Sequence, residues 1–500
     1  MPKTTTDFAS LGLLPTLSGN LASLGYLQMT PIQQQALPMI LAGNDVLARA
    51  KTGSGKTAAF GLGLLSRLDV KLYRVQALVI CPTRELADQV ASEVRRLARQ
   101  IHNIKVLTLC GGRAIGPQVG SLTHGAHIVV GTPGRLLQHL RKNTLRLAAA
   151  RMLVLDEADR MLDMGFEEDL VDIIAYLPDD RQTLLFSATY PAGMDAMSGN
   201  VQKDPAYIDV AADEPSNPVT EHFYRVAAHR KPTKPSAGTP NSPLELPDRK
   251  AALDLLLKHF LPESTLVFCN TKIDCRAVAN TLGQRGFSAL ALHGDLEQRD
   301  RDEVLIRFAN RSANIVVATD VAARGLDIKD LAAVVNFELP TQSEVYVHRI
   351  GRTARAGRGG LVISLFSDSE VHRLPAVARS CAQQPFPFDE MAASQLRAPP
   401  SPTMTTLCIN GGRKNKLRPG DILGTLTADG TVTSADVGKI NVTDHQSYVA
   451  IVNKQANRAL SLLAGRMKGR TFQVRPYASV TRSRRTSRPP PTEKSLKNDI

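Results

Sequence analysis

The chain of 500 residues lacks the features that mark metal-binding, secreted and membrane proteins. Its six cysteines are scattered without a Cys-x-x-Cys pair, which disfavours zinc ligation and disulfides and predicts small buried side chains instead. No segment approaches the roughly 20 apolar residues that cross a membrane. The amino-terminal sequence also lacks the basic start and apolar core of a secretory signal. We therefore expect a cytoplasmic protein without membrane association.

What the chain does carry is positive charge, and this charge is localised. The 61 Lys and Arg against 47 Asp and Glu give a net charge of +14. Residues 404–500 hold 17 Lys and Arg against 6 Asp and Glu, so +11 of that total lies there and the preceding residues carry only +3. Because no amphipathic apolar face accompanies these charges, a nucleic acid is the expected partner. A composition of 43% hydrophobic and 22% charged residues excludes disorder throughout.

Short apolar runs, each followed by a polar or glycine-containing cluster, indicate buried parallel strands. Helical stretches separate them; residues 85–100, for example, carry apolar residues at the helical period. The runs form two successive sets and predict two tandem α/β domains. The expected strands are Asp45–Ala48, Ala77–Cys81, Ile128–Val130, Met152–Leu155 and Thr183–Phe186 in the first domain, and Thr265–Cys269, Ala289–Leu292, Ile315–Ala318 and Ala333–Phe337 in the second.

Changes in composition suggest further boundaries. A segment rich in proline and small polar residues is predicted as a flexible surface insertion just inside the second domain, after an edge strand at Glu221–Val226. The expected division is a first α/β domain at 1–212, a second at 213–370 with the insertion at 230–247, a linker at 371–403, a small RNA-binding domain at 404–478 and a disordered basic tail at 479–500.

The small carboxy-terminal domain is predicted as a β-α-β-β-α-β unit similar to an RNA-recognition motif. Its strands are expected at Thr406–Ile409, Val437–Val442, Ser447–Val452 and Thr471–Val474, with helices at Pro419–Leu426 and Gln455–Leu463. Its aromatic platform is thin: Cys408 stands where such domains often place a stacking ring, leaving Tyr448 and Phe472 or Tyr477.

RNA affinity of this domain should therefore rest on exposed positive charge. The alternative is that the charges only keep a small domain soluble. The residues expected to bind RNA here are Arg413, Lys414, Lys416, Arg418, Lys468 and Arg470.

A phosphate-binding loop is predicted at residues 50–57, where AKTGSGKT follows an expected strand and precedes the helical stretch Ala58–Leu68. The glycines let backbone N–H groups turn toward phosphate oxygens, the lysine supplies a positive charge, and the threonine hydroxyl can be a ligand of Mg²⁺. The helix presents its positive end to the phosphates. The loop residues are Ala50, Lys51, Thr52, Gly53, Ser54, Gly55, Lys56 and Thr57.

Asp156 and Glu157 directly follow the expected strand Met152–Leu155. In nucleotide hydrolases a carboxylate in this place holds Mg²⁺, and its neighbour orients or deprotonates the attacking water. Acidic residues at a strand end are a weak signal alone, because many are simply solvated. Together with the phosphate loop, they predict a nucleotide hydrolase in which Thr57 and Asp156 bind the metal and Lys56, Asp156 and Glu157 act in catalysis.

The sequence Asp-Glu-Ala-Asp at 156–159, with the segments around it, resembles the DEAD-box RNA helicases of superfamily 2 over nearly all of residues 8–370. The resemblance implies two RecA-like domains, ATP and Mg²⁺ as cofactors, and RNA as partner. Tyr26, Thr30 and Gln33 are similar to the Q motif of that family, in which the aromatic ring stacks on adenine and the glutamine amide reads the base edge. Phe8 takes the place of the isolated aromatic of that motif.

Further segments in family order imply contacts to the sugar-phosphate backbone of RNA. Ser187, Ala188 and Thr189 resemble the segment that couples the ATP state to RNA contact. Singly, each segment could be an ordinary helix start or turn, but their order across two domains argues against chance. The implied RNA-binding residues are Pro82, Thr83, Arg84, Gly111, Gly112, Thr132, Pro133, Gly134 and Arg135, then Asn270, Thr271, His293, Gly294, Asp295, Thr319 and Asp320.

The second domain is also expected to complete the ATP site. Gly325 and Asp327 match family positions near the ribose and the Mg²⁺ or water network. Arg352 and Arg355 match arginine fingers, which bring positive charge to the γ-phosphate. Ala354 replaces the usual family glycine, a departure that moves neither arginine.

The segment LCINGGRKNKLRPGDILG and the later ADVGKI, following such a core, resemble the bacterial DbpA group of these helicases. This implies an RNA-stimulated ATPase that unwinds RNA locally, directed to a hairpin of 23S ribosomal RNA in assembly of the large ribosomal subunit, and we expect a monomer. Two alternatives remain: an ATP-dependent RNA clamp or annealing protein with a vestigial ATPase, and a DNA-unwinding motor of the same superfamily.

Overall fold

The computed structural model describes residues 7–51, 53–191, 193–210, 219–227, 247–323, 331–353, 359–377 and 397–477. These residues divide into two compact units, one within 1–220, 323–330 and 341–360, the other within 221–322, 331–340 and 361–500. The expected insertion, apart from Pro247, and the expected basic tail lie outside the described residues, as does most of the expected linker. The domain boundaries derived from the sequence therefore stay predictions.

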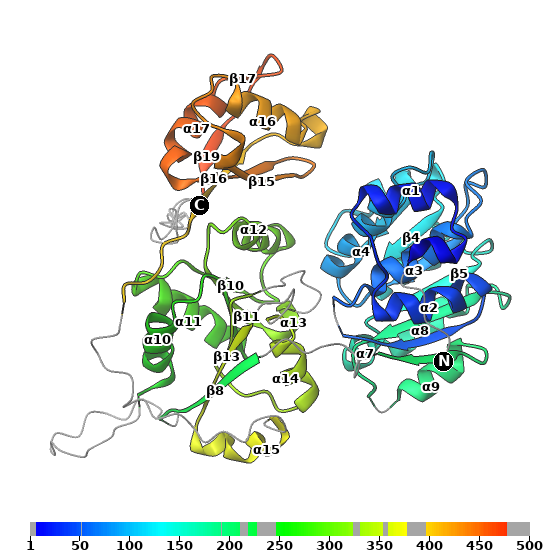
Figure 1. Ribbon diagram of the computed structural model, residues 1–500, viewed down its shortest axis with the longest axis horizontal. Coiled ribbons are helices and arrows are strands. Elements are labelled where there is room, and N and C mark those ends of the chain that lie inside the picture. The colour runs from blue at the N-terminus through cyan, green and yellow to red at the C-terminus, as the bar shows by residue number, and fades with distance from the viewer. Residues whose placement is uncertain are drawn as a thin grey trace, which may run out of the picture. The chain divides into compact units, whose positions relative to one another are not determined.

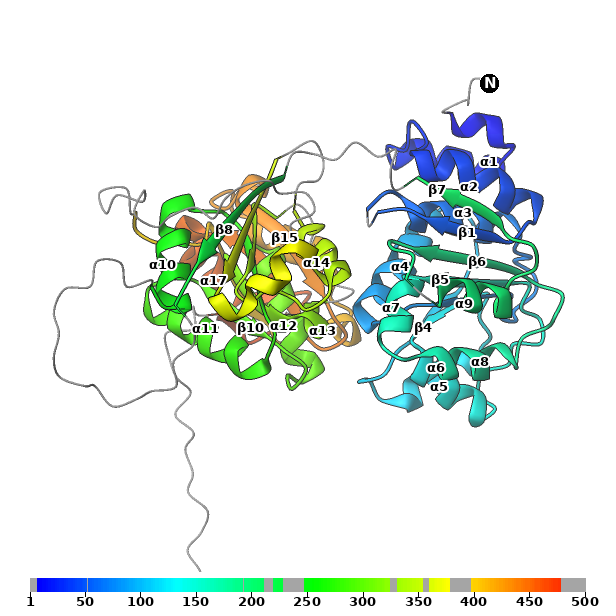
Figure 2. The same cartoon turned by 90° about the horizontal axis from the view of Figure 1, so that it is seen from below.

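The first unit is built on a seven-stranded sheet in which all neighbouring strands are parallel. Its strands are mostly apolar because helices cover both faces, as Figure 2 shows. In spatial order they are β3 (Val106–Leu109), β4 (Ile128–Gly131), β2 (Ala77–Ile80), β5 (Met152–Asp156), β6 (Gln182–Ser187), β1 (Val46–Arg49) and β7 (Ala206–Asp209).

The helices of this unit form two apolar layers with the sheet between them. One layer consists of η1 (Phe8–Leu11), α1 (Pro15–Ser23), α2 (Pro31–Ala42), α3 (Lys56–Ser66) and α4 (Arg84–Leu97). The other consists of α5 (Ile115–Thr123), α6 (Pro133–Arg141), α7 (Ala158–Asp163), α8 (Glu167–Ile174) and α9 (Met194–Val201).

A second sheet of six strands follows the same plan. Neighbouring strands from β10 to β13 pair in parallel, and β8 lies at the edge, which confirms the predicted edge strand. The order is β10 (Ala289–Leu292), β11 (Ile315–Thr319), β9 (Thr265–Cys269), β12 (Ala333–Asn336), β13 (Gly360–Phe366) and β8 (Val219–Arg225). The helices in this part of the chain are α10 (Arg249–Phe260), α11 (Lys272–Gln284), α12 (Gln298–Ala309), α13 (Asp320–Ala323), α14 (Ser343–Ile350), η2 (Asp368–Arg373) and α15 (Leu374–Val377).

The carboxy-terminal domain, residues 404–477, has a four-stranded antiparallel sheet. Its order is β15 (Val437–Val442), β16 (Ser447–Val452), β14 (Met404–Ile409) and β19 (Val474–Pro476), with η5 (Arg413–Asn415), η6 (Ser434–Asp436) and η7 (Asn453–Gln455) as short turns. Helices α16 (Pro419–Thr427) and α17 (Ala456–Leu463) pack on one face of this sheet and enclose its apolar core (Figure 1). The predicted α+β domain similar to an RNA-recognition motif is confirmed.

One predicted strand, Thr471–Val474, is wrong. The chain forms a separate hairpin, β17 (Arg466–Met467) with β18 (Arg470–Thr471), and β19 begins only at Val474. The cause is the turn between the hairpin strands, where Lys468 and Gly469 both have positive φ angles of 50° and 74°. A reversal at this point takes Thr471 out of the four-stranded sheet.

None of the five cysteines in the described part of the chain forms a disulfide, and all five are buried, as predicted from their spacing. Among the same residues, no helix is long and apolar enough to cross a membrane.

Helix α4 is held at both ends by side chains. Thr83 caps its first turn, because its Oγ1 accepts a hydrogen bond from the backbone N–H of Leu86 at 3.3 Å. At the other end, the buried Nδ2 of Asn20 donates to the carbonyls of Arg96 and Leu97, at 3.0 and 2.7 Å. The Arg96 carbonyl also accepts from the Arg99 N–H at 3.3 Å, so the carbonyl that relies on Asn20 of α1 is that of Leu97.

We expect Asn20→Ala to lower the free energy of unfolding of the first unit by about 1–3 kcal/mol, because it removes the side-chain donor to the Leu97 carbonyl in an apolar setting. The measurement is the urea midpoint followed by circular dichroism. A shift equivalent to less than about 0.5 kcal/mol, the size usual for a surface substitution, would contradict a capping role.

Candidate active site and RNA-binding surfaces

The phosphate loop joins β1 to α3 and is shaped by its glycines. Gly53 and Gly55 have φ angles of +93° and +101°, a backbone conformation that other residues rarely adopt. Lys56 begins α3; it is buried, and its Nζ donates a hydrogen bond to the Ala50 carbonyl at 3.0 Å. The loop thus places a positive charge and the amino terminus of a helix at the end of β1, as the sequence predicts.

The predicted Q segment packs directly on this loop. The buried amide of Gln33 accepts a hydrogen bond from the Thr30 N–H at 3.0 Å through Oε1 and donates from Nε2 to the Gly55 carbonyl at 3.2 Å. A Cβ atom on Gly55 would lie only 2.5 Å from that Nε2, so glycine is required here for the close approach. The contact of Gln33 with adenine stays a prediction, while its contact with the phosphate loop is a finding that the sequence did not reveal.

The carboxylate pair lies at the end of β5, in the centre of the first sheet. Asp156 is the last residue of the strand and is almost fully buried. Burial raises the pKa of Asp156 to about 7; the charge of Lys56 opposes this rise and that of Glu157 adds to it. Lys56 and the two carboxylates therefore act on one another electrostatically, which brings the predicted catalytic groups of this domain into one site.

Glu157 sits at a sharp turn between β5 and α7, with a φ angle of +55°. Its side chain is buried, and its Oε2 lies 3.2 Å from Nε of Arg160. That oxygen has no aligned hydrogen-bond donor among the described residues. A buried carboxylate oxygen left in this way is available to accept a proton or a hydrogen bond from a bound water.

The last residue of the Asp-Glu-Ala-Asp sequence connects the nucleotide site to the predicted coupling segment. Oδ2 of Asp159 accepts hydrogen bonds from the Thr189 N–H and Oγ1, at 2.9 and 2.7 Å. Ser187 in turn donates from Oγ to the Thr189 carbonyl at 2.6 Å. Burial alone would raise the pKa of Asp159, but His348, whose Nε2 lies 3.5 Å from Oδ2, and the hydrogen bonds from Thr189 hold that pKa well below its ordinary value. Ser187 and Thr189 are thus fixed to the segment that carries Asp156.

The residues present fit a Mg²⁺ ion bound together with a nucleotide. In the described part of the chain, no group of three or more His, Cys, Asp or Glu could hold a metal ion. Mg²⁺ keeps several waters and uses one or two carboxylates plus substrate phosphates, so one carboxylate and a threonine hydroxyl are a suitable set of protein ligands. Thr57 follows Lys56 in the first turn of α3, and Asp156 is a buried carboxylate that interacts electrostatically with Lys56.

Three predicted RNA-binding segments lie at neighbouring strand ends of the first sheet. They follow β2, β3 and β4, which are adjacent in the order β3-β4-β2. Arg84 lies against Gly112, where a Cβ atom would be 2.0 Å from the guanidinium. Nη2 of Arg135 donates to the Arg113 carbonyl at 2.9 Å. Because the carboxyl ends of parallel strands meet at one edge, the fold brings together Pro82–Arg84, Gly111–Gly112 and Thr132–Arg135.

The second sheet gathers its predicted RNA-binding residues in the same way, after β9, β10 and β11, which are also neighbours. Thr271 caps α11 by accepting from the Asp274 N–H at 3.1 Å. Asp295 accepts from Lys272 Nζ at 2.6 Å and from Arg276 Nη2 at 3.0 Å, and Nε of Arg276 donates to His293 Nε2 at 2.9 Å. The first turns of α11 therefore hold the His293–Asp295 segment in place.

Four predicted ATP-site residues, Thr52, Gly325, Asp327 and Arg355, lie outside the described residues. Arg352 is described and is buried just after α14. The predicted roles of both arginines stay predictions.

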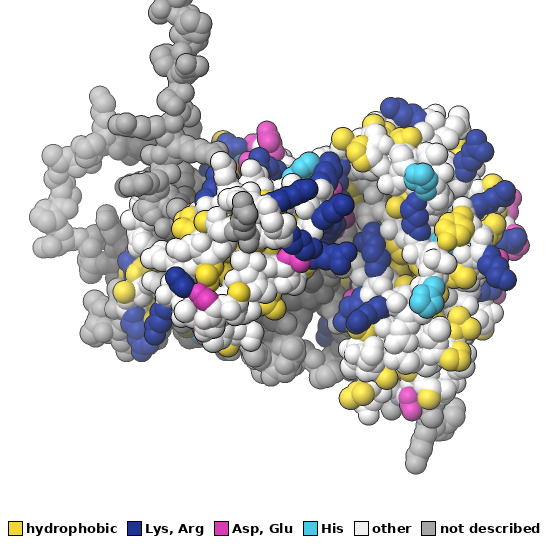
Figure 3. Space-filling view, turned by 90° about the horizontal axis from the view of Figure 1, so that it is seen from above, with side chains coloured by type: hydrophobic (Ala, Val, Ile, Leu, Met, Phe, Trp, Pro, Cys, Tyr) yellow, Lys and Arg dark blue, Asp and Glu magenta, His cyan; other side chains and the backbone are white. Residues whose placement is uncertain are grey.

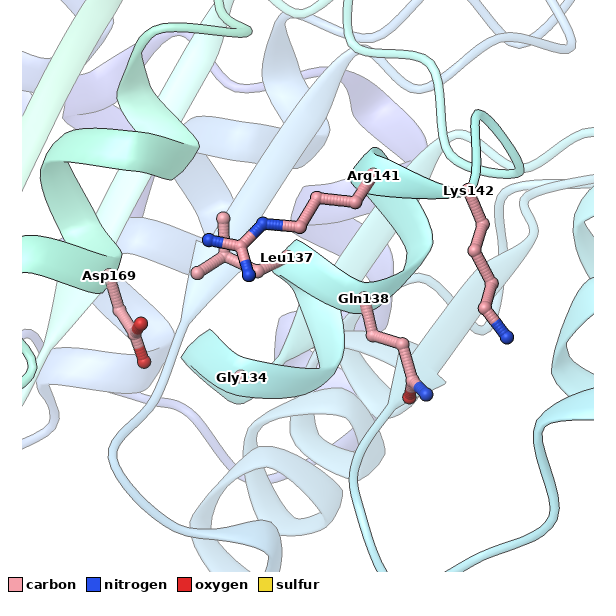
Figure 4. Close-up of a pocket in the computed structure, with 6 residues that line it drawn as sticks. All are labelled: Gly134, Leu137, Gln138, Arg141, Lys142 and Asp169. Carbon is pink, nitrogen blue, oxygen red and sulfur yellow. The ribbon is translucent and has the colours of Figure 1, made fainter.

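A pocket of about 320 Å³ lies beside one of the segments predicted to bind RNA. Figure 4 shows it between α6 and α8, lined by Gly134, Leu137, Gln138, Arg141, Lys142 and Asp169. Arg141 is also paired with Asp172 at 2.8 Å. The pocket adjoins the predicted RNA-binding segment Thr132–Arg135, because Gly134 is one of its lining residues.

The carboxy-terminal domain presents its predicted basic residues on two loops, 413–418 and 468–470, here called the basic loops. All six basic residues are exposed. The structure joins the two loops: Nζ of Lys468 donates to the Lys416 carbonyl at 3.3 Å and pairs with Asp421 at 2.8 Å. A Cβ atom on Gly412 would lie 2.3 Å from the Thr443 carbonyl, which explains the glycine at the start of the first loop.

The sheet face predicted to stack RNA bases is covered. Cys408 and Tyr448 are only 2% and 4% exposed, and Phe472 is packed in the apolar core. The ring of Tyr477 lies over Tyr448, with centroids 5.9 Å apart, and Arg307 of α12 lies over Tyr477. Oγ1 of Thr406 is 2.6 Å from Oγ of Ser312. Tyr448 is therefore not an open stacking surface, either with Phe472 or with Tyr477, because Tyr477, Arg307 of α12 and Ser312 after that helix occupy this face.

The charged residues of the carboxy-terminal domain are mainly Lys and Arg. On the side of the molecule seen in Figure 3, Lys and Arg side chains outnumber Asp and Glu. The basic loops are consequently the part of the carboxy-terminal domain that fits a polyanion.

A phosphate loop, a buried carboxylate pair and polar loops at the carboxyl ends of two parallel sheets define a nucleotide hydrolase with two α/β domains. Sequence families match each part: DEAD/DEAH box helicase at residues 30–197, helicase conserved C-terminal domain at 248–357 and DbpA RNA binding domain at 406–476.

Individual proteins agree with these matches. The chain is 52% identical over 472 residues to ATP-dependent RNA helicase DbpA of Escherichia coli. This alignment covers 94% of this chain and 99% of that protein. It is 40% identical to DEAD-box ATP-dependent RNA helicase CshA of Bacillus cereus, over 78% of this chain and 70% of that protein.

Solved structures show the same fold. Saccharomyces cerevisiae Dbp5 bound to RNA and ADP BeF3 aligns with a TM-score of 0.66 and 28% identity over 78% of this chain and 98% of that chain. Mss116p bound to single-stranded RNA and AMP-PNP aligns with a TM-score of 0.66 and 27% identity over 80% and 83%. The chain belongs to the DEAD-box ATP-dependent RNA helicases, a family of RNA-dependent ATPases that bind ATP, and within it to the DbpA group.

The structure also reveals a buried network that sequence reasoning missed. The ring nitrogens of His139 on α6 lie 2.8 Å from Thr144 Oγ1 and 3.1 Å from Gln118 Oε1. Nε2 of Gln118 donates to the Cys110 carbonyl at 3.1 Å, one residue before Gly111. His139 thus connects the helix after Thr132 to the glycine loop. No sequence pattern marks it, because a single histidine on a helix has no distinctive spacing.

Burial lowers the pKa of His139, and the charges of Arg135 and Lys142 add to this effect. The folded protein therefore resists protonation that the unfolded chain accepts near pH 6.5, so stability is present above that pH and is lost as the pH falls below it. We expect the free energy of unfolding, followed through the urea midpoint, to fall between pH 7 and pH 5. This group contributes at most about 1.4 kcal/mol per pH unit to that fall. His139→Gln should flatten that fall and His124→Gln, an exposed control, should not. An unchanged slope in His139→Gln would refute the assignment.

Proposed function

We propose that the protein hydrolyses ATP to ADP and phosphate when RNA is bound and uses the cycle to separate short RNA duplexes. The observation that carries this proposal is the convergence of Lys56, Asp156 and Glu157 at the end of the central strand β5, joined through Asp159 to Thr189. A hydrolytic centre attached in this way to a coupling segment suits a motor rather than a passive binding protein.

The chain's own residues define the chemical step. Lys56 and the loop N–H groups bind the outer phosphates, while Tyr26 and Gln33 face the base. Glu157 accepts a proton from water as the water oxygen bonds to the γ-phosphorus and the bond to the bridging oxygen of ADP breaks. Arg352 and Arg355 stabilise the charge on the transferred group. Thr57 and Asp156 would hold Mg²⁺, which neutralises phosphate charge when bound.

The RNA segments of both sheets act on the sugar-phosphate backbone, so the core does not read sequence. ATP and RNA together favour the closed arrangement of the two α/β domains, in which one strand is bent and the adjacent base pairs break. Hydrolysis and phosphate release return the core to its open state.

We further propose that the target is 23S ribosomal RNA in precursors of the large ribosomal subunit, and that the protein acts as a cytoplasmic monomer. The match to the DbpA RNA binding domain and the exposed basic loops support this assignment. Recognition of a hairpin by the carboxy-terminal domain would supply the selectivity that the core lacks.

The test is ATP turnover with and without 23S ribosomal RNA fragments, with DNA strands of the same sequence for comparison. We expect strong stimulation by RNA alone. Lys56→Ala should reduce turnover by about 100-fold or more, since it removes the charge at the outer phosphates, yet leave hairpin binding intact. Turnover that RNA does not stimulate would support the clamp or annealing alternative, and stimulation by DNA would support the DNA motor.

The basic loops can be tested separately by gel-shift measurements of hairpin affinity at several salt concentrations. We expect the double variant Lys414→Ala, Arg418→Ala to bind about tenfold or more weakly and to lower the salt slope by about two, because two phosphate contacts are lost. Lys454→Ala, an exposed lysine of the same domain outside the basic loops, is the matched control. Equal effects of both changes would contradict a localised site.

A further inference from the structure

The aromatic ring of Tyr26 is fixed by two charged residues of α4. Its hydroxyl donates to Oε1 of Glu93 at 2.7 Å and accepts from Nη2 of Arg96 at 2.7 Å. Arg96 also binds Glu93 twice, from Nε to Oε2 at 3.0 Å and from Nη2 to Oε1 at 2.8 Å. The three side chains form a closed set of hydrogen bonds in which every donor faces an acceptor.

The Tyr26 ring is also contacted on one face and in an edge-on arrangement, in addition to the hydrogen bonds of its hydroxyl. The guanidinium of Arg96 lies 5.4 Å from the ring centroid, and Phe8 meets the ring edge-on with centroids 6.3 Å apart. Burial, followed by the hydrogen bond to Glu93, raises the pKa of Tyr26 to about 12, so the hydroxyl stays a donor over the physiological range. Because Arg96 takes one ring face, a stacked base must use the other.

The support itself is rigid. Glu93 and Arg96 project from the last part of α4, whose terminal carbonyls accept from the buried Asn20. The side chain of Glu93 is 22% exposed and that of Arg96 is 45% exposed, so either residue can be substituted without leaving a cavity in the apolar core.

We propose that Glu93 and Arg96 are positioning residues for ATP binding, which hold the Tyr26 ring where it stacks on adenine. This inference rests on the proposed role of Tyr26 in the ATP site. Neither residue touches ATP. A ring free to rotate must lose that freedom when adenine binds, and the cost appears in ATP affinity rather than in the chemical step.

The experiment measures kcat and KM for ATP at saturating RNA in the full chain. We expect Glu93→Ala and Arg96→Ala to raise KM roughly three- to tenfold, the range for one or two lost hydrogen bonds, with kcat changed less than about twofold. Glu93→Gln keeps an acceptor for the tyrosine hydroxyl, so it should retain most of the ATP affinity that Glu93→Ala loses. Arg99→Ala, which removes a charge from an exposed residue just past the same helix, is the control and should leave KM unchanged.

Tyr26→Phe distinguishes positioning from a general effect on stability. It removes the hydroxyl and keeps the ring, so we expect the same rise in KM and no further rise when it is combined with Glu93→Ala. Additive effects in that double variant would overturn the proposal.

Tyr26→Ala separates this inference from the proposed function. If it raises KM while Glu93→Ala and Arg96→Ala do not, the inference fails and the adenine contact stands. If Tyr26→Ala leaves KM unchanged, the adenine contact and the inference both fail, while RNA-stimulated turnover at saturating ATP still stands as the separate test of the motor.

Discussion

The constraint on which this structure depends is the burial of two parallel sheets on both faces. Strands covered by helices on each side cannot expose polar groups along their length, so chemistry is confined to the carboxyl ends. In the first sheet Asp156 is the last residue of β5, and Lys56 and Thr189 follow the ends of β1 and β6; in the second sheet Asn270, His293 and Asp320 directly follow strand ends. The order of the strands then decides which of these residues become neighbours.

Much of this could be predicted because the signals are local. Apolar runs located the main strands of both sheets to within one or two residues, and the phosphate loop is readable because glycine, lysine and threonine must follow one another there. The sequence order of the polar segments also indicated which strand ends carry them. Here local pattern and global fold agree, as expected for a sequence with little conflict between the two.

What could not be predicted are contacts made by ordinary residues far apart in the chain. Tyr26 and Glu93 are separated by 67 positions, and a Glu–Arg pair three residues apart on a helix is common. The sequence pattern does not predict the hairpin at Lys468–Gly469, because alternating residues on either side of the turn suggest one longer strand. The covering of Cys408 and Tyr448 depends on packing between two domains, which no periodicity within either one reports.

The covered face of the carboxy-terminal sheet has a consequence for how this protein can change over evolution. A surface that similar domains use for recognition here serves attachment, through Thr406, Tyr448 and Tyr477. Under the proposed function, recognition falls to exposed loops whose side chains contribute little to the apolar core. Substitutions in those loops would then alter which RNA is preferred without altering how the domain is attached, so specificity and attachment could vary independently.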